Sequence, residues 1–284
     1  MQPIVARAVN GQPHNNPSPN APGVPLLQGV NWGGLKTLYI KEVRRFFKVQ
    51  LQTVWAPAIT TLLFLAIFTI ALGREGRMVI GVPFANFLAP GLIAMAMIQN
   101  AFANASFSLL VGKVQGNIVD YMMPPLSIGE LIAGLVGASV TRAFLVGLAV
   151  WLAMLVWPGV SVEVRRPELV LLFGLLGALM LSFFGLITSI WAEKFDHAAA
   201  VSNFVVTPLS LLSGTFYSVD QLPPSWAAFS HANPFFFIIS GFRAGFIGVS
   251  DSPLVLGASV LIAINLALFA TCYALLKSGW KIKN

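Results

Sequence analysis

Residues 168–192 read ELVLLFGLLGALMLSFFGLITSIWA, and after its first residue this stretch carries no charge. A helix rises 1.5 Å per residue and the hydrocarbon core of a bilayer is about 30 Å thick, so ~20 apolar residues suffice to cross it. Further runs of similar length and composition precede and follow it. The sequence predicts an all-α, polytopic membrane protein with six transmembrane helices, at about 54–73, 87–112, 127–157, 168–192, 198–217 and 253–276.

The composition of the chain agrees with this fold class. Hydrophobic residues make up 57% of the 284 residues and charged residues only 10%, whereas a soluble domain has about 25% charged residues. Six spans use more than half of the chain, so no soluble catalytic domain fits beside them. The net charge of +7 comes from cations that border the apolar runs, which is typical of membrane anchoring and not of nucleic-acid binding. The histidines are scattered and Cys272 is the only cysteine, so we expect no metal, no cofactor and no catalytic residue in this chain.

The amino-terminal part divides into a tail and an amphipathic segment. Residues 1–30 are rich in Pro, Asn and Gln, and we expect a disordered tail before a transmembrane domain of residues 31–284. Residues 32–52 show helical periodicity, with one apolar face and one basic face. Such a helix lies flat in the membrane interface, either as a lipid anchor alone or also as a contact for a partner. Its candidate residues are Lys41, Arg44, Arg45 and Lys48.

The distribution of lysines and arginines predicts the orientation. The segments on the side of the amino terminus hold more of these cations than the opposite segments. Since six spans are an even number, the positive-inside rule predicts that both termini lie in the cytoplasm. No pair of matching halves is visible in the sequence, which weakens the interpretation as a secondary transporter.

The connector Lys113–Pro125, KVQGNIVDYMMPP, is longer than a simple turn needs. Its glycine loosens the end of the second span, and its two prolines prevent helix continuation. We expect a short helix along the inner surface, over about 117–123, that docks against a partner; a simple turn is the alternative. The candidate residues are Gly116, Asn117, Ile118, Asp120, Tyr121, Met122 and Pro124.

The outer segment Phe216–Ser252 is rich in aromatic residues and is broken by prolines. None of its pieces is long enough to cross the membrane and return, so we expect re-entrant or interfacial helices between spans five and six. The segment is either an aromatic belt at the outer interface or a gate for substrate. Its candidate residues are Phe216, Tyr217, Trp226, Asn233, Pro234, Phe236 and Arg243.

Two arginines fall within or beside apolar segments. Arg142 either pairs in the translocation region or belongs to a helix end that projects into the cytoplasm, and Glu130 is too far along the same helix to reach it. Arg243 is flanked by glycines. For both arginines we expect a structural pairing within the protein in preference to contact with a substrate. Gly29 and Gly34 have the spacing of a phosphate-binding loop, but Leu35 stands where a lysine is needed, so we expect no ATP site in this chain.

Three motifs resemble the membrane subunit of ABC transporters of the ABC-2 type, also called type 2 exporters, over about residues 30–280. They are the connector Gly116–Pro125, the stretch 208–224 (PLSLLSGTFYSVDQLPP) and the stretch 233–248 (NPFFFIISGFRAGFIG). The chain looks closest to the YadH-like, nodulation-factor and polysaccharide exporters of bacteria.

The resemblance implies a half-transporter in the bacterial inner membrane. Two such chains pair, and two copies of a separate ATPase, which holds ATP and Mg, dock beneath them. The amphipathic segment corresponds to the connecting helix of that family, residues 113–125 to its coupling helix and 218–245 to its outer re-entrant helices.

The resemblance also implies a cleft lined by spans one, two and five. Its candidate lining residues are Gln99, Asn100, Asn104, Ser202, Asn203 and Thr207. A mildly polar, uncharged lining favours an amphipathic substrate such as a lipid, a glycolipid or polysaccharide, or a hydrophobic drug. The alternative is that these side chains only make hydrogen bonds between helices.

Three hypotheses of function follow. The first is the permease subunit of an ATP-driven exporter, which is no enzyme itself. The second is a stand-alone secondary transporter or channel, which usually needs acidic residues in mid-membrane. The third is an integral membrane enzyme that acts on lipids, for which the acidic residues are too scattered.

Overall fold

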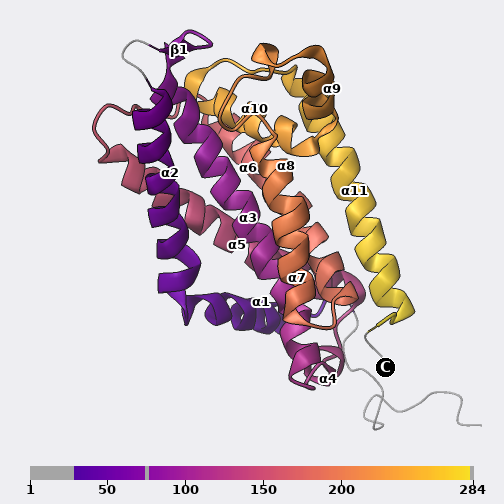
Figure 1. The fold of residues 1–284 in the computed structure, drawn as a ribbon. Coiled ribbons are helices and arrows are strands. Elements are labelled where there is room, and N and C mark those ends of the chain that lie inside the picture. The colour runs from indigo at the N-terminus through magenta and orange to yellow at the C-terminus, as the bar shows by residue number, and fades with distance from the viewer. Residues whose placement is uncertain (1–28, 74–76, 282–284) are drawn as a thin grey trace, which may run out of the picture.

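The computed structural model describes residues 29–73 and 77–281, which are mostly helical (Figure 1). Helix α1 (Trp32–Phe47) lies across one end of the bundle, and a π-helical turn, η1 (Leu51–Trp55), joins it to the upright helix α2 (Ala56–Leu72). An antiparallel hairpin that the sequence did not predict, β1 (Met78–Val79) and β2 (Val82–Pro83), pairs Met78 with Pro83 and Val79 with Val82. The other elements are, in chain order, α3 (Phe84–Val114), α4 (Val119–Met122), α5 (Ile128–Leu155), α6 (Pro167–Trp191), α7 (Phe195–Val201), the π-helical turn η2 (Ser202–Val206), α8 (Thr207–Leu211), the 3₁₀ turn η3 (Val219–Gln221), α9 (Pro224–Ala232), α10 (Pro234–Ile247) and α11 (Leu254–Ser278).

The flat helix α1 is shorter than the predicted 32–52. It ends at Phe47, where the chain turns upward into α2 (Figure 1). The hydroxyl of Thr53 donates to the carbonyl oxygens of Phe46 and Val49, at 2.9 and 3.1 Å. This side chain therefore adds a hydrogen bond to each of two carbonyl groups at the turn between α1 and α2, which also accept backbone N–H groups.

Within the described residues, five helices are long and apolar enough to cross a membrane: Leu51–Ala71, Phe84–Val114, Ile128–Leu155, Pro167–Trp191 and Leu254–Ser278. They match predicted spans one, two, three, four and six, with ends that differ by a few residues.

The predicted fifth span, 198–217, has a different form. Its helical part runs from Phe195 to Leu211 as α7, η2 and α8, which is only about 25 Å at 1.5 Å per residue. The helix stops before 217 because Gly214 takes a left-handed conformation, with φ of 74°. The hydroxyls of Ser213 and Thr215 both donate to the carbonyl of Ser210. Figure 1 shows that this segment still connects the end that holds α4 with the end that holds α9 and α10.

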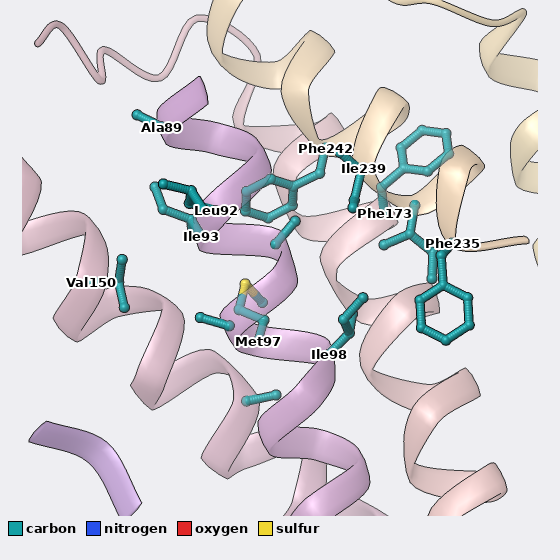
Figure 2. Packing of buried hydrophobic residues seen from close by; sticks show 14 of the residues in the cluster. Ala89, Leu92, Ile93, Met97, Ile98, Val150, Phe173, Phe235, Ile239 and Phe242 are labelled. Carbon is teal, nitrogen blue, oxygen red and sulfur yellow. The ribbon is translucent and has the colours of Figure 1, made fainter. Parts of the chain in front are cut away.

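Helix α3 is the centre of the bundle. It is buried over most of its length, whereas α2 and α11 are mostly exposed. Figure 2 shows Ile93, Met97 and Ile98 of α3 packing among side chains from α5, α6 and α10. Small residues let α6 approach α3 closely: a Cβ at Gly185 would lie 2.6 Å from the carbonyl oxygen of Phe102.

The outer segment folds as two short helices, α9 and α10. The chain enters and leaves this segment at the same end of the bundle (Figure 1). Helix α10 is about 21 Å long and is buried from Phe235 to Ile247 against α3, α6 and α11. An apolar helix that is too short to span and is enclosed by longer helices has the form expected for a re-entrant element.

Candidate functional site

The connector after α3 forms an exposed tip at one end of the molecule (Figure 1). Gly116 adopts φ of 73°, which ends α3, and the predicted two-turn helix is a single turn, α4. Asp120 and Met122 are exposed, as are Gly116, Asn117 and Pro124, while Ile118 is half-buried. Val119 and Met123 expose 54% and 76% of their surface, so the tip presents apolar side chains outward.

Tyr121 points the other way, into the protein. It is 7% exposed, and its hydroxyl donates to Oε1 of Glu42 at 3.1 Å. The ammonium group of Lys41 lies 3.6 Å from the centre of its ring. Burial and then the negative charge of Glu42 raise the pKa of the Tyr121 phenol, so the phenol stays protonated and keeps donating. These contacts attach α4 to α1.

Glu42 is the centre of this buried polar cluster, and sequence reasoning missed it. Its side chain is fully buried and accepts hydrogen bonds from Tyr121 and from Ser108 of α3. Nη2 of Arg45 lies 3.0 Å from Glu42 Oε2. A buried carboxylate is tolerated because these partners compensate for its lost hydration. The signal in the sequence was a single acid on the apolar face of α1, one turn from both Leu38 and Phe46 and three residues before an arginine.

Arg45 does not share the exposed basic face expected for it. Its Nη2 atom donates to the carbonyl of Asn104 at 2.9 Å and to the hydroxyl of Ser108 at 3.1 Å. The amide of Asn104 in turn donates to Ser139 of α5 at 2.9 Å. Lys41, Arg44 and Lys48 are exposed. One continuous network of polar contacts therefore joins α4, α1, α3 and α5.

The start of α1 is held as well. The backbone N–H of Asn31 donates to Glu130, and its side-chain amide donates to the carbonyl of Pro125 at 3.2 Å. Glu130 also forms a capping box with Ser127 at the start of α5. Glu130 is thus a helix cap, and it is not the partner of Arg142. Helix α1 is fixed at both ends to the elements around the connector.

Two adjoining grooves contain the α3 residues predicted to line a cleft. Gln99 and Asn100 line a groove of about 320 Å³ between α2 and α3. Asn104 lines a second groove of about 310 Å³, together with Arg45 and Arg142, and Gln52 borders both. Ser202, Asn203 and Thr207 lie on η2 and at the start of α8, and neither of these two grooves includes them. A single chain therefore brings together only the three α3 residues of the six that were predicted to line a cleft.

Arg142 lies in the middle of an unbroken α5, 14 residues after its first residue Ile128. It is half-buried, and its Nη2 atom donates to Oδ1 of Asn100 at 2.9 Å. The expected structural pairing is present, but the partner is a neutral amide.

Arg243 is paired as expected, at the end of the bundle that holds α9 and α10. Its Nη1 atom lies 2.9 Å from Oδ2 of Asp251, and both side chains are 2% exposed. Its Nη2 atom donates to the carbonyl of Gly214 at 2.7 Å, and its guanidinium lies 3.8 Å from the centre of the Phe87 ring. Arg243 thus joins α10 to the loop after α8, to the segment before α11 and to α3.

The other outer candidates are structural in their contacts. Asn233 caps α10 and also donates to the carbonyl of Leu209 at 2.8 Å, Pro234 occupies the first turn, and Phe236 is fully buried. The ring of Phe216 lies 4.4 Å from that of Phe68 on α2. Tyr217 is half-buried, and Trp226 on α9 is 56% exposed.

The described residues contain no group of three or more His, Cys, Asp or Glu side chains that could hold a metal ion. What the geometry offers is mechanical: an exposed tip connected by buried polar contacts to the central helices.

Comparison with known proteins places this arrangement in a family. The profile of the ABC-2 type transporter family matches residues 34–247. The inner membrane transport permease YadH of Escherichia coli strain K12 is 38% identical over 258 residues, which is 91% of this chain and all of that protein. Nodulation protein J of Neorhizobium galegae is 26% identical over 68% of this chain and 72% of its own length, and that of Rhizobium leguminosarum bv. viciae is 24% identical over 88% and 95%. The chain is a membrane protein with several spanning helices, and it belongs to the ABC-2 type transporter family.

Proposed function

We propose that this chain is the membrane-spanning permease subunit of an ATP-driven exporter in a bacterial inner membrane. Two copies pair, and two copies of a separate ATPase supply the energy. The family match and the similarity to an inner membrane transport permease support this assignment.

The observation that carries the proposal is the connector tip. Val119, Met122 and Met123 are exposed on a single turn of helix whose inward residue, Tyr121, contacts the buried Glu42. An ATPase docked on the tip would push on α4, and the polar contacts would pass the displacement to α1, α3 and α5. ATP binding to the ATPase would thus stabilise one of two arrangements of the bundle, because the ATPase contacts the two arrangements differently.

The cargo that fits best is an amphipathic molecule. The grooves beside α3 combine amide side chains such as Gln99 and Asn100 with apolar ones such as Phe64 and Leu92. Binding of a chain with a polar head uses both kinds of surface.

A retention experiment tests the docking role of the tip. The permease is immobilised in detergent and exposed to its co-expressed ATPase, as the wild type and as Met123→Asp. We expect the charge to abolish ATPase retention because it disrupts an apolar contact. Met78→Asp is the matched control, since Met78 is 57% exposed on β1 at the opposite end.

Equal retention by Met123→Asp and the wild type would contradict the docking role. Transport driven by an ion gradient in the purified permease, without an ATPase, would contradict the whole proposal and favour a secondary transporter.

A further inference from the structure

The two grooves beside α3 contain buried hydrogen-bond donors that have no protein acceptor. Within the described part of the chain, Nε of Arg142, Nη1 of Arg45 and Nε2 of Gln99 are buried without a partner. Arg45 and Arg142 line one groove and Gln99 lines the other. Donors in excess of acceptors indicate a place suited to an acceptor group from another molecule.

The nearby amide acceptors are already occupied. Oδ1 of Asn100 accepts from Arg142, and Oδ1 of Asn104 accepts from Arg45 at 3.3 Å. Each of these two amide oxygens therefore already has a donor within the protein, and the remaining donors have none.

The charge of the site is also unbalanced. Arg45 pairs with Glu42, but none of the ion pairs among the described residues includes Arg142. A guanidinium inside a spanning bundle without a counter-charge is costly, and an anion with two oxygen atoms would satisfy it by charge-assisted hydrogen bonds.

The side chains around the donors indicate that the rest of the ligand is apolar. The groove that contains Gln99 and Asn100 continues along α2 and α3 past Pro57, Phe64 and Leu92, which are apolar. Asn100 lies one helical turn, ~6 Å, above Asn104, which contacts α1. A head group at Arg142 would thus sit just above the flat helix, within reach of lipids at that membrane face.

We propose that this pair of grooves binds an anionic amphiphile, with its phosphate or carboxylate at Arg142 and its apolar chain between α2 and α3. The claim that this amphiphile is the transported cargo rests on the proposed function. The claim that the grooves bind it does not. The ligand is either a resident phospholipid or a transported molecule of the same chemistry.

Native mass spectrometry of the purified permease tests binding without any ATPase. The protein is mixed with equal amounts of dioleoylphosphatidylglycerol and dioleoylphosphatidylcholine, which share their chains and differ in net charge. We expect the wild type to retain the anionic lipid about ten-fold better, which is the low end for a charged hydrogen-bonded pair. Equal retention of both lipids would overturn the proposal.

Three variants locate the site. Arg142→Gln removes the charge and should abolish the preference. Asn100→Asp is nearly isosteric and supplies an internal counter-charge, so it should abolish the preference while the protein stays folded. Arg166→Gln removes an exposed cation at the start of α6 and should keep the preference. An unchanged preference in Asn100→Asp would overturn the assignment to Arg142.

A second arm distinguishes the two sources of ligand. In liposomes that contain the permease and its ATPase, outward movement of a fluorescent short-chain phosphatidylglycerol should require ATP and fail in Asn100→Asp if the ligand is cargo. Binding without movement supports the site as one for a resident lipid. If the wild-type permease shows no lipid preference but retains the ATPase, only this inference is wrong. If it shows the lipid preference but does not retain the ATPase, only the permease assignment is wrong.

Discussion

Tyr121 and Glu42 show how two residues join the tip of the molecule to its interior. The phenol is held by one hydrogen bond to a carboxylate that has no exposure to solvent. Sequence reasoning placed Tyr121 in the docking helix but not the residue that it contacts, because partners 79 positions apart leave no periodic signal. The partner of Arg243, Asp251, was not identified either, although it is only eight positions away, because it lies in the loop between α10 and α11.

Tyr121→Phe should uncouple ATP hydrolysis from transport. The ring and its packing stay, but the Glu42 carboxylate loses one of its donors, which weakens the attachment of α4 to α1 by about 1.5–3 kcal/mol. We expect the ratio of cargo moved to ATP hydrolysed, measured in liposomes with the ATPase, to fall several-fold. Tyr273→Phe, on the exposed side of α11, is the control and should leave the ratio unchanged.

Asp251→Asn should destabilise the outer end. The change leaves Arg243 buried without its counter-charge, which typically costs about 3–5 kcal/mol. Thermal unfolding in detergent should show a clear drop in midpoint, whereas Glu163→Gln, an exposed acid near the same end, should not. Equal midpoints for the two variants would show that the buried pair has no structural role.

At the scale of elements, the close approach of α3 and α6 decides the packing of the bundle. Five spans were predictable because each is a long apolar run, and length with hydropathy is a strong signal. The shorter form of α7–η2–α8 was not predictable, because its end depends on the conformation of Gly214 and on side-chain bonds to the Ser210 carbonyl. The hairpin β1–β2 was missed since two-residue strands are too short for a period to show.

Gly185→Ala should push α6 away from α3. The new methyl group would lie 2.6 Å from the Phe102 carbonyl oxygen and 2.9 Å from the Cβ of Ala105, so one helix must shift. Overpacking of this kind costs about 1–3 kcal/mol, which a lower unfolding midpoint would report. Gly129→Ala is the matched control, because a Cβ there meets no atom within 4 Å.

At the scale of the whole molecule, α1, α4 and the last turn of α11 lie at one end, and α9, α10 and the hairpin lie at the other (Figure 1). The sequence predicted this division from its charges and its proline-broken outer segment. It did not predict which α3 residues share a groove, since that depends on how α2, α3 and α5 cross.

Cysteine labelling tests the orientation and the crossing of α7–α8 together. Cys272 is buried, so single cysteines can be introduced at exposed positions and treated with a membrane-impermeant maleimide in whole cells. We expect Trp226→Cys and Met78→Cys to react from outside and Met123→Cys and Glu193→Cys only after lysis. Reaction of Glu193→Cys but not of Trp226→Cys in intact cells would reverse the predicted orientation, and reaction of both would mean that the α7–η2–α8 segment does not cross the membrane.

The attachment of α1 at both ends has a mechanical consequence. Asn31 binds Glu130 and Pro125, while Arg45 binds Asn104 and Ser108. A force on the connector therefore reaches this helix at two points about 20 Å apart along its axis. It must then tilt as a rigid bar, so spin labels placed near its two ends should keep their mutual spacing throughout the ATP cycle while both change their distance to α9.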